Sequence, residues 1–268
     1  MVDQRSTDSV AIIQGADTID LQEEGSHGVL LLHGFGDTPQ TLSLIARRLT
    51  KFGYGVLAPL LPGHGRSMDA FRRSRASEWI SAAKNALLQL RDRYATVSVV
   101  GLSMGGALGV LLAAETRSVA SLVLIAPYLG MPIEVRLAAA THWLWGALAG
   151  EIDARNPRSI HDPIERERNL AYGMVTGRAL YELSKVVMQA RRALPNVTAP
   201  TLVILSREDP RVSAGVAEFT MQRLGAEEKK LVWTEGAGHI VTVDYGRERV
   251  FSEVTEWLRQ HAGNSDSR

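Results

Sequence analysis

Short apolar, β-branched runs alternate along the chain with stretches whose apolar residues recur every three or four positions. Such runs predict buried strands, and the six clearest are Gly28–His33, Gly55–Pro59, Thr96–Val100, Ser121–Ala126, Thr201–Ser206 and Lys230–Thr234. Weaker runs at Val10–Ile13 and Thr18–Leu21 predict an antiparallel edge ahead of them. Strands that alternate with helices in this way indicate a parallel sheet covered by helices on both faces.

Five helices fit between the predicted strands. Their apolar positions are Leu42, Ile45, Leu49 and Phe52; then Trp79, Ala83, Leu87 and Leu90; then the run Met104–Glu115; then Val216, Phe219 and Leu224; and finally Val250, Val254 and Trp257. Gly53 is expected to end the first helix, and Ser77 to open the second. The third helix is apolar nearly all round, so we expect it to be buried.

The alternation breaks between about Leu129 and Asn196. This stretch shows no good strand, but Ile133–Gly146 and Leu180–Leu194 have helical patterns. So long an excursion between two core strands predicts a helical cap, which divides the chain into core residues 1–128, cap residues 129–196 and core residues 197–268. Trp143 and Trp145 either face an apolar substrate or anchor the cap to the core, and the pattern leaves both interpretations open.

Gly101-Leu102-Ser103-Met104-Gly105 matches G-x-S-x-G where a predicted strand runs into a predicted helix. The turn in this motif is tight enough to strain the backbone of the serine. Gly101 and Gly105 supply the positions on either side that have no room for a side chain. The helix that follows directs its N-terminus at the serine and favours negative charge there. The motif predicts Ser103 as a nucleophile.

A serine hydroxyl needs a base to take its proton, and His239 is the best candidate. It ends the stretch Gly236-Ala237-Gly238-His239, after the last strong strand and before the final helix. The base should follow an acid along the chain, in the order serine, acid, histidine.

The acid is expected after the strand Thr201–Ser206, where Glu208 and Asp209 compete. Asp-x-x-Val places the carboxylate of Asp209 in the turn, with Val212 returning to the core, so Asp209 is favoured. Glu208 is then an exposed neighbour. Two further acids, Asp37 and Asp244, are interpreted as solvated or capping residues.

Two backbone N–H groups should face the oxygen that gains charge when an acyl group is attacked. One belongs to Met104, directly after the serine. The other is expected from the turn His33-Gly34-Phe35-Gly36, through the N–H of Phe35. The alternative is that these glycines only make a turn.

Composition narrows the remaining classes of function. The net charge is +1, which gives no reason to expect nucleic acid or an acidic membrane as a partner. The chain has no cysteine, which excludes disulfides and thiol nucleophiles, and its seven histidines lack metal-site spacing. The polar N-terminus has no secretory core, and no apolar run approaches the ~20 residues that cross a bilayer. We expect a soluble, cytoplasmic monomer or homodimer without stable membrane insertion, cofactor or metal, acting on a small molecule.

Several of these stretches together resemble one known family. LLLHGFGDTPQ, APLLPGHG, GLSMGG, LVILSREDPRV and AGHIVTVDY are similar to segments of bacterial carboxylesterases and monoacylglycerol lipases of the α/β-hydrolase fold, from about Gly28 to Trp257. The resemblance implies a doubly wound, mostly parallel sheet with a small cap. It also implies cofactor-free hydrolysis of short- to medium-chain acyl esters. By the same resemblance Ser103, Asp209 and His239 form a triad, and the N–H groups of Phe35 and Met104 form the oxyanion hole.

One departure from the family bears on the substrate. In bacterial monoacylglycerol lipases a Leu-Ala-Tyr stretch of the cap is followed by an acid that can hold glycerol hydroxyls, whereas Leu170-Ala171-Tyr172 is followed here by Gly173. A general carboxylesterase is therefore favoured. The alternatives are a hydrolase with the same triad acting on thioester, amide or carbon–carbon bonds, a perhydrolase, and a ligand receptor on a hydrolase scaffold.

Overall fold

A seven-stranded sheet forms the centre of the computed structural model, which describes residues 10–262. The strand order is β1-β3-β2-β4-β5-β8-β9, and the strands are β1 (Ile19–Leu21), β2 (His27–Leu32), β3 (Gly55–Ala58), β4 (Thr96–Leu102), β5 (Val119–Ile125), β8 (Thr201–Ser206) and β9 (Lys229–Thr234). Only β1 is antiparallel to its neighbour. The six strong strands and the parallel sheet are thus confirmed.

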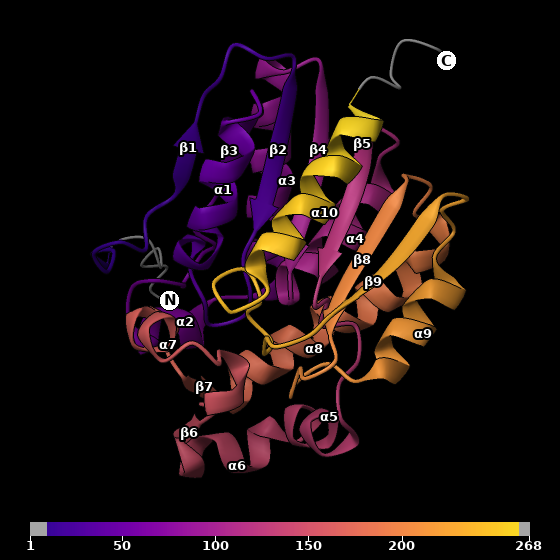
Figure 1. Ribbon diagram of the computed structural model, residues 1–268. Helices are drawn as coiled ribbons and strands as arrows, with labels where there is room; N and C mark the ends of the chain where they lie inside the picture. Colours follow the sequence, from indigo (N-terminus) through magenta and orange to yellow (C-terminus); the bar gives the residue numbers. More distant parts are fainter. Residues whose placement is uncertain (1–9, 263–268) are drawn as a thin grey trace.

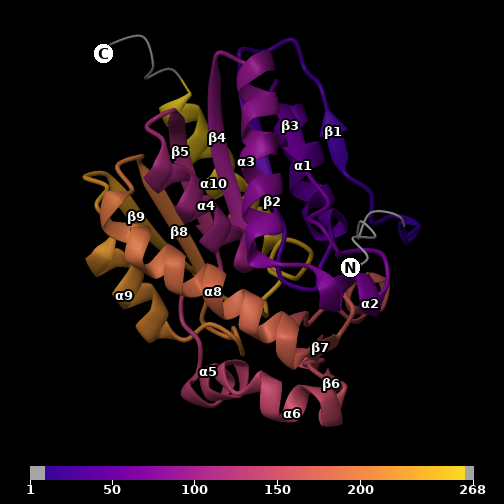
Figure 2. The ribbon, with the colours of Figure 1, turned by 180° about the vertical axis from the view of Figure 1, so that it is seen from behind.

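Helices cover both faces of this sheet, as Figures 1 and 2 show from opposite sides. One face carries α1 (Ser43–Thr50) and α10 (Arg247–His261); the other carries α3 (Ala76–Arg93), α4 (Met104–Glu115), α8 (Gly177–Ala193) and α9 (Ala214–Arg223). Each helix buries its apolar stripe, and α4, apolar nearly all round, is packed among its neighbours. Such two-sided burial explains why the central strands are uniformly apolar.

The edge of the sheet differs in part from the prediction. Residues 19–21 pair antiparallel with β3, as expected of the Thr18–Leu21 run. Val10–Ile13 forms no strand, so that part of the prediction is wrong. The N–H of Ile13 instead donates to the carbonyl of Gly65 at 2.8 Å, and Arg66 donates to the carbonyl of Val10. The segment therefore pairs with an irregular loop rather than with a strand.

Among the short helices that were not predicted are η2 (Pro39–Leu42), α2 (Met68–Arg73) and α7 (Pro163–Arg168). The last two span six residues each, too few to establish a helical period in the sequence. What marks the start of these two helices is instead the side chain at the N-cap position. Ser67 accepts from the N–H of Ala70, and Asp162 accepts from the N–H groups of Ile164 and Glu165.

All remaining elements lie between β5 and β8. They are α5 (Ile133–Ala140), α6 (His142–Ala149), β6 (Glu151–Asp153), η3 (Pro157–Ser159), α7, β7 (Met174–Thr176), α8 and η4 (Leu194–Asn196). Figure 1 shows α5, α6, β6 and β7 beyond the carboxyl ends of the parallel strands. We call residues 129–196 the inserted segment. That it forms a separate cap domain stays a prediction.

The inserted segment is helical, as its pattern indicates, but it also contains an antiparallel pair, β6 with β7. Each strand spans three residues, and β6 is exposed along its whole length, so no apolar alternation marks it in the sequence. Trp145 packs over Gly177 of α8 and donates to the carbonyl of Ala138 at 2.9 Å. Trp143 is 71% exposed. Trp145 thus contributes to packing within the segment.

Glu182 joins the inserted segment to the core through the start of α3. Its carboxylate is 4% exposed and accepts from the N–H of Ala76 at 3.0 Å. That N–H belongs to the first turn of α3, where backbone donors have no partner inside the helix. Lys185 lies 2.6 Å from the same oxygen and balances the charge.

We predict that Glu182→Ala lowers the free energy of unfolding by about 1–3 kcal/mol, because it leaves a buried helix-start donor without an acceptor. Urea unfolding followed by circular dichroism measures the change. Glu227→Ala, which removes an exposed carboxylate, is the matched control and should stay within about 0.5 kcal/mol of the parent. Equal stability of the two variants would contradict the assigned role of Glu182.

Candidate active site

Ser103 lies in the turn that carries the chain from β4 into α4. Its backbone has a φ of 56° and a ψ of −115°, a conformation that residues with a side chain rarely adopt. Besides its hydrogen bonds into α4, two link it to the end of β5 and the chain after it: the N–H of Ser103 donates to the carbonyl of Ile125 at 2.9 Å, and its carbonyl accepts from the N–H of Tyr128 at 3.0 Å. The strain expected at this serine is present, and β5 with the chain after it supports the strained residue.

The two glycines that flank the turn have no room for a side chain. A Cβ on Gly101 would lie 2.2 Å from the carbonyl oxygen of Gly105, and a Cβ on Gly105 would lie 1.9 Å from that of Leu32. Both distances are far below van der Waals contact. Helix α4 therefore approaches the end of β2 as closely as a backbone allows, and that approach aims its N-terminus at Ser103.

Side chains from three distant parts of the chain meet at this turn. Nε2 of His239 lies 2.8 Å from Oγ of Ser103, and Nδ1 of His239 lies 2.8 Å from Oδ2 of Asp209. The side chain of Asp209 is fully buried and that of His239 is 8% exposed. Because a carboxylate can only accept, Nδ1 donates to Asp209 and Nε2 is left to accept the proton of the serine hydroxyl. The three predicted side chains are thus joined in one hydrogen-bonded row.

The turn after β8 explains why Asp209 rather than Glu208 faces the histidine. Oδ1 of Asp209 accepts from the N–H groups of Arg211 and Val212, at 2.7 and 3.0 Å, which leaves Oδ2 for His239. Val212 is buried, as the pattern indicates. The side chain of Glu208 is half exposed and accepts instead from the N–H of Gly236.

The turn after β2 lies against Ser103. A Cβ built on Gly34 would come within 3.5 Å of Cβ of Ser103. Nδ1 of His33 contacts the carbonyl of Gly34 at 2.9 Å, and Nε2 accepts from the N–H of Leu61 at 3.1 Å. Burial lowers the pKa of His33 to about 4, against the opposing hydrogen bond to Gly34. The ring therefore stays neutral, with Nδ1 donating, and holds the turn that carries Phe35.

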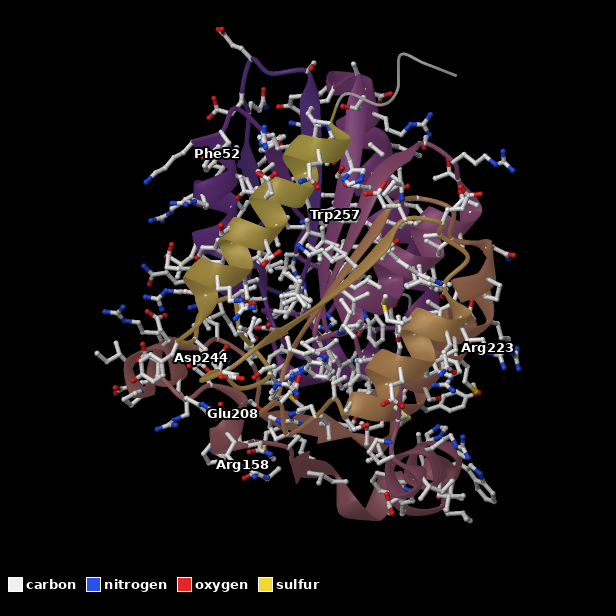
Figure 3. The ribbon with its side chains drawn as sticks, turned by 45° about the vertical axis from the view of Figure 1, so that its right-hand side comes forward. Phe52, Arg158, Glu208, Arg223, Asp244 and Trp257 are labelled. Carbon is white, nitrogen blue, oxygen red and sulfur yellow. The ribbon has the colours of Figure 1, made fainter. Side chains whose placement is uncertain are left out.

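Asp244 departs from its prediction as a solvated or capping residue. It is completely buried, and its two oxygens accept from the backbone N–H groups of His161, Asp162, Gly238 and Tyr245 at 2.7–2.9 Å. Burial alone raises the pKa of Asp244, but these hydrogen bonds outweigh it and hold the pKa below its ordinary value. Asp244 therefore joins the histidine loop to the inserted segment. Figure 3 shows Asp244 and Glu208 toward the same end of the molecule.

Asp37 is likewise buried rather than solvated, with 4% of its surface exposed. Its Oδ2 accepts from the hydroxyl of Thr41 at 2.8 Å, whereas its Oδ1 has no hydrogen-bond partner among the described residues. Burial raises the pKa of Asp37 to about 6, against the hydrogen bonds of Thr41 and Thr38 and the charge of His239. Sequence patterns do not separate a buried carboxylate from an exposed one in a loop, so this feature was missed.

Tyr172 makes contacts between the inserted segment and the core that the sequence pattern did not predict. Its N–H donates to the carbonyl of Gly36 at 2.9 Å, and its hydroxyl donates to the carbonyl of Gly63 and accepts from the N–H of Arg66, both at 2.9 Å. Its ring packs on Phe71 with centroids 5.1 Å apart. The inserted segment is thereby attached to the turn that carries Phe35.

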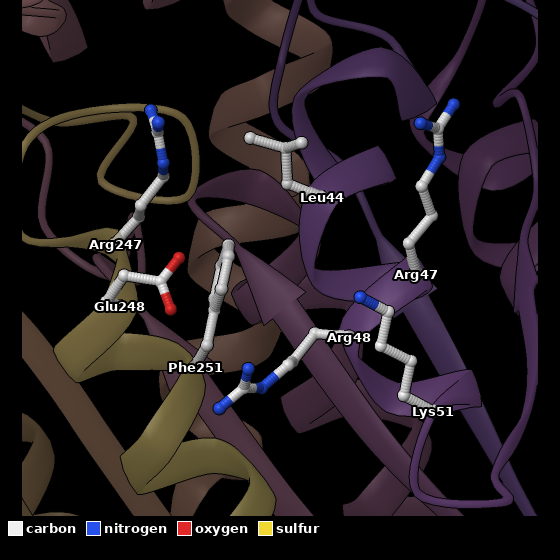
Figure 4. A pocket seen from close by; sticks show the side chains of 7 residues that line it. All are labelled: Leu44, Arg47, Arg48, Lys51, Arg247, Glu248 and Phe251. Atoms are coloured by element: carbon white, nitrogen blue, oxygen red, sulfur yellow. The ribbon is translucent and has the colours of Figure 1, made fainter.

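Some features of the described chain lie apart from this site. A cavity of about 290 Å³ opens between α1 and α10, lined by Leu44, Arg47, Arg48, Lys51, Arg247, Glu248 and Phe251. Figure 4 shows the guanidinium groups of Arg47 and Arg247 at opposite sides of the view, so they do not converge on one centre. Within residues 10–262 no group of three or more histidine or acidic side chains is arranged to hold a metal ion. No helix in that range is both long and apolar enough to span a bilayer.

Comparison with known proteins agrees with the fold. The family model described as "Serine aminopeptidase, S33" matches residues 24–245. A thermostable monoacylglycerol lipase of Bacillus sp. (strain H-257) is 29% identical over 94% of this chain and 98% of its own length. A carboxylesterase of Bacillus subtilis (strain 168) is 24% identical over 88% of this chain and 94% of its own.

Solved structures lead to the same fold. A structure reported for LipS and LipT, two metagenome-derived lipolytic enzymes, has a TM-score of 0.86 and 28% identity, covering 94% of this chain and all of the other. A monoacylglycerol lipase of Paleococcus ferrophilus has a TM-score of 0.76 at 18% identity, covering 91% of this chain and 98% of the other, which shows the fold alone.

We predict that Asp244→Asn lowers the free energy of unfolding by about 2–3 kcal/mol at pH 7, since an amide cannot accept all of these backbone donors. The folded-state pKa of Asp244 is lowered, so its contribution is present above the unfolded value near 4 and is lost as pH falls below it. The difference in stability between the two proteins should therefore narrow as the pH falls below about 4. Urea unfolding between pH 3 and 7 measures this, with the exposed Asp92→Asn as control. A gap that stayed constant with pH would be the contrary result.

Proposed function

The chain belongs to the serine aminopeptidase S33 family of the α/β-hydrolase superfamily, and from this membership we propose that it is a carboxylic ester hydrolase that uses Ser103, His239 and Asp209 as a catalytic triad. The observation that carries the proposal is the hydrogen-bonded row from Oγ of Ser103 through His239 to Asp209, with 2.8 Å at each step. Its order and geometry are those of a serine made nucleophilic by a neighbouring base.

The first step forms an acyl-enzyme. Nε2 of His239 takes the proton of Ser103 as Oγ bonds to the ester carbonyl carbon, and Asp209 keeps Nδ1 protonated throughout. The carbonyl oxygen gains negative charge next to the N-terminus of α4. His239 then gives its proton to the alcohol oxygen as the ester bond breaks. Water repeats the sequence on the acyl group and releases the acid.

The N–H groups of Phe35 and Met104 are the proposed oxyanion donors. Met104 opens α4, so its N–H has no acceptor within the helix. Phe35 belongs to the turn that His33 holds against Ser103, and no hydrogen bond of the described chain uses its N–H. Donors fixed in advance cost no reorganisation when charge appears, which is the source of their catalytic effect.

Residues 129–196 are proposed to form the cap over this site, since α5, α6, β6 and β7 lie beyond the carboxyl ends of the strands that carry the triad and α8 returns the chain along the sheet. The substrates proposed are esters of short- to medium-chain acyl groups. Gly173 has a φ of +65°, and a Cβ placed there would lie 2.5 Å from Cγ of Arg155. The position that follows Leu170-Ala171-Tyr172 therefore holds no carboxylate for glycerol hydroxyls and has little room for one. This favours a general carboxylesterase over a dedicated monoacylglycerol lipase.

We predict that Ser103→Ala folds like the parent and hydrolyses p-nitrophenyl esters about 10⁴- to 10⁶-fold more slowly, because the nucleophile is gone. Initial rates measure the loss, and circular dichroism checks the fold. Ser213→Ala, which changes an exposed serine outside the site, is the control and should keep parental rates. A fluorophosphonate should label the parent and Ser213→Ala but not Ser103→Ala. Parental turnover by Ser103→Ala would defeat the assignment.

A second prediction concerns the substrate. Across p-nitrophenyl esters from acetate to palmitate, kcat/KM should be highest for short to medium chains, and 1-monoacylglycerols should show no preference over simple esters of the same acid. Aminoacyl p-nitroanilides in the same panel test the amide hydrolysis that the family description suggests. A panel dominated by anilide cleavage, or by monoacylglycerol, would redirect the proposal to that substrate.

A further inference from the structure

We propose that Asp37 is a positioning residue of this site, whose buried negative charge stabilises His239 in the protonated form that it adopts during catalysis. The inference rests on the proposed function, since it assigns a part in the reaction of Ser103. Nothing in the triad geometry requires a second carboxylate, because Asp209 already accepts the proton-bearing Nδ1 of His239.

The position of Asp37 is fixed relative to the reacting serine. It follows the turn that carries Phe35, and its N–H donates to the carbonyl of Gly34 at 3.4 Å. A Cβ built on Gly34 would lie 3.5 Å from Cβ of Ser103 and 3.6 Å from Oδ2 of Asp37. Cβ of Ser103 and Oδ2 of Asp37 therefore lie no more than 7.1 Å apart, the sum of these two distances.

The carboxylate of Asp37 also lacks part of its hydrogen bonds, which distinguishes it from a carboxylate that only stabilises the fold. Oδ2 accepts the hydroxyl of Thr41, but Oδ1 is buried and has no partner among the described residues. Asp244, in contrast, has both oxygens occupied by backbone donors. A buried carboxylate that has no hydrogen bond at one of its oxygens interacts strongly with a nearby cation, because few other groups stabilise its negative charge.

The charge of His239 acts on Asp37 and lowers the pKa of its carboxyl, against the larger effect of burial. Asp209 faces His239 from the turn after β8. His33, in the same turn as Gly34, stays neutral because burial lowers its pKa to about 4. The charge that changes next to Asp37 during the reaction is therefore that of His239.

The proton balance of the reaction is unaltered by this role. The proton of Ser103 passes to Nε2 of His239 and then to the leaving alcohol, and Asp37 takes no part in the transfer. In the ground state His239 is neutral, and in the transition state it carries a positive charge. An ionised Asp37 lowers the energy of the second state relative to the first, which is the condition for faster turnover.

The test compares the parent with Asp37→Asn across pH 5–9 on a short-chain p-nitrophenyl ester. At pH 8 we expect kcat of Asp37→Asn to fall about tenfold with KM little changed, because one buried charge that stabilises the imidazolium is lost. Asp37 of the parent is itself protonated below pH ~6, the region of its raised pKa. The two rates should therefore converge as pH falls from 7 to 5.

Two further variants separate an electrostatic role of Asp37 from a structural one. Thr41→Val keeps the carboxylate but removes the hydroxyl that stabilises its charged form. The pKa of Asp37 should then rise, so the decline in rate should begin at a higher pH while the plateau near pH 9 stays close to that of the parent. Asp69→Asn makes the same chemical change at a half-exposed carboxylate on α2 and should leave the profile unchanged.

The outcomes distinguish this inference from the proposed function. If Ser103→Ala is inactive but Asp37→Asn matches the parent at every pH, the role of Asp37 is wrong and the triad stands. A loss in Asp37→Asn that is equal at pH 5 and pH 8 indicates a structural role and also overturns the inference. Activity in Ser103→Ala would remove the proposed function itself. If Asp37→Asn does not fold, the shift of the Thr41→Val profile decides the question.

Discussion

The turn between β4 and α4 holds Ser103 in a strained backbone conformation with a positive φ, and this strain is offset by packing that leaves no space for two Cβ atoms. Backbone in this conformation costs on the order of 1–3 kcal/mol, so it persists only where neighbours fix it. The neighbours here are the end of β5, through two hydrogen bonds, and the end of β2, through contact with Gly105. The position of the Ser103 side chain is consequently fixed by the fold itself.

The three buried acids around His239 are held in three different ways. Asp209 shares its oxygens between two backbone donors and the imidazole, which fixes both the ring and the turn after β8. Both carboxylate oxygens of Asp244 accept from backbone N–H groups, and these hydrogen bonds hold the loop that carries His239 against His161 and Asp162 of the inserted segment. Asp37 has one oxygen unfilled. The three carboxylates thus differ in their hydrogen-bond partners, and the electrostatic role proposed for Asp37 rests on that difference.

The sequence predicts most of the sheet, because strands buried on both faces are uniformly apolar, and it predicts the serine turn, because glycines there are forced by sterics. The prediction fails for features that a periodic pattern of apolar residues does not mark. Helices of six residues and strands of three are too short to show a period. Val10–Ile13 has the composition of a strand, but its hydrogen bonds go to a loop. The burial of Asp37 and Asp244 depends on chain segments far away in the sequence, so local pattern gives no sign of it.

The hydroxyl and N–H of Tyr172 connect the inserted segment to two loops of the core at once. Such segments are attractive units to exchange between relatives when a new specificity is sought. In this chain an exchange of residues 129–196 alone would remove the ring that closes over Phe71 and the donor to Gly36. A graft that preserves the serine chemistry has to carry its own equivalent of Tyr172, or import the loop at residues 63–67 together with the segment.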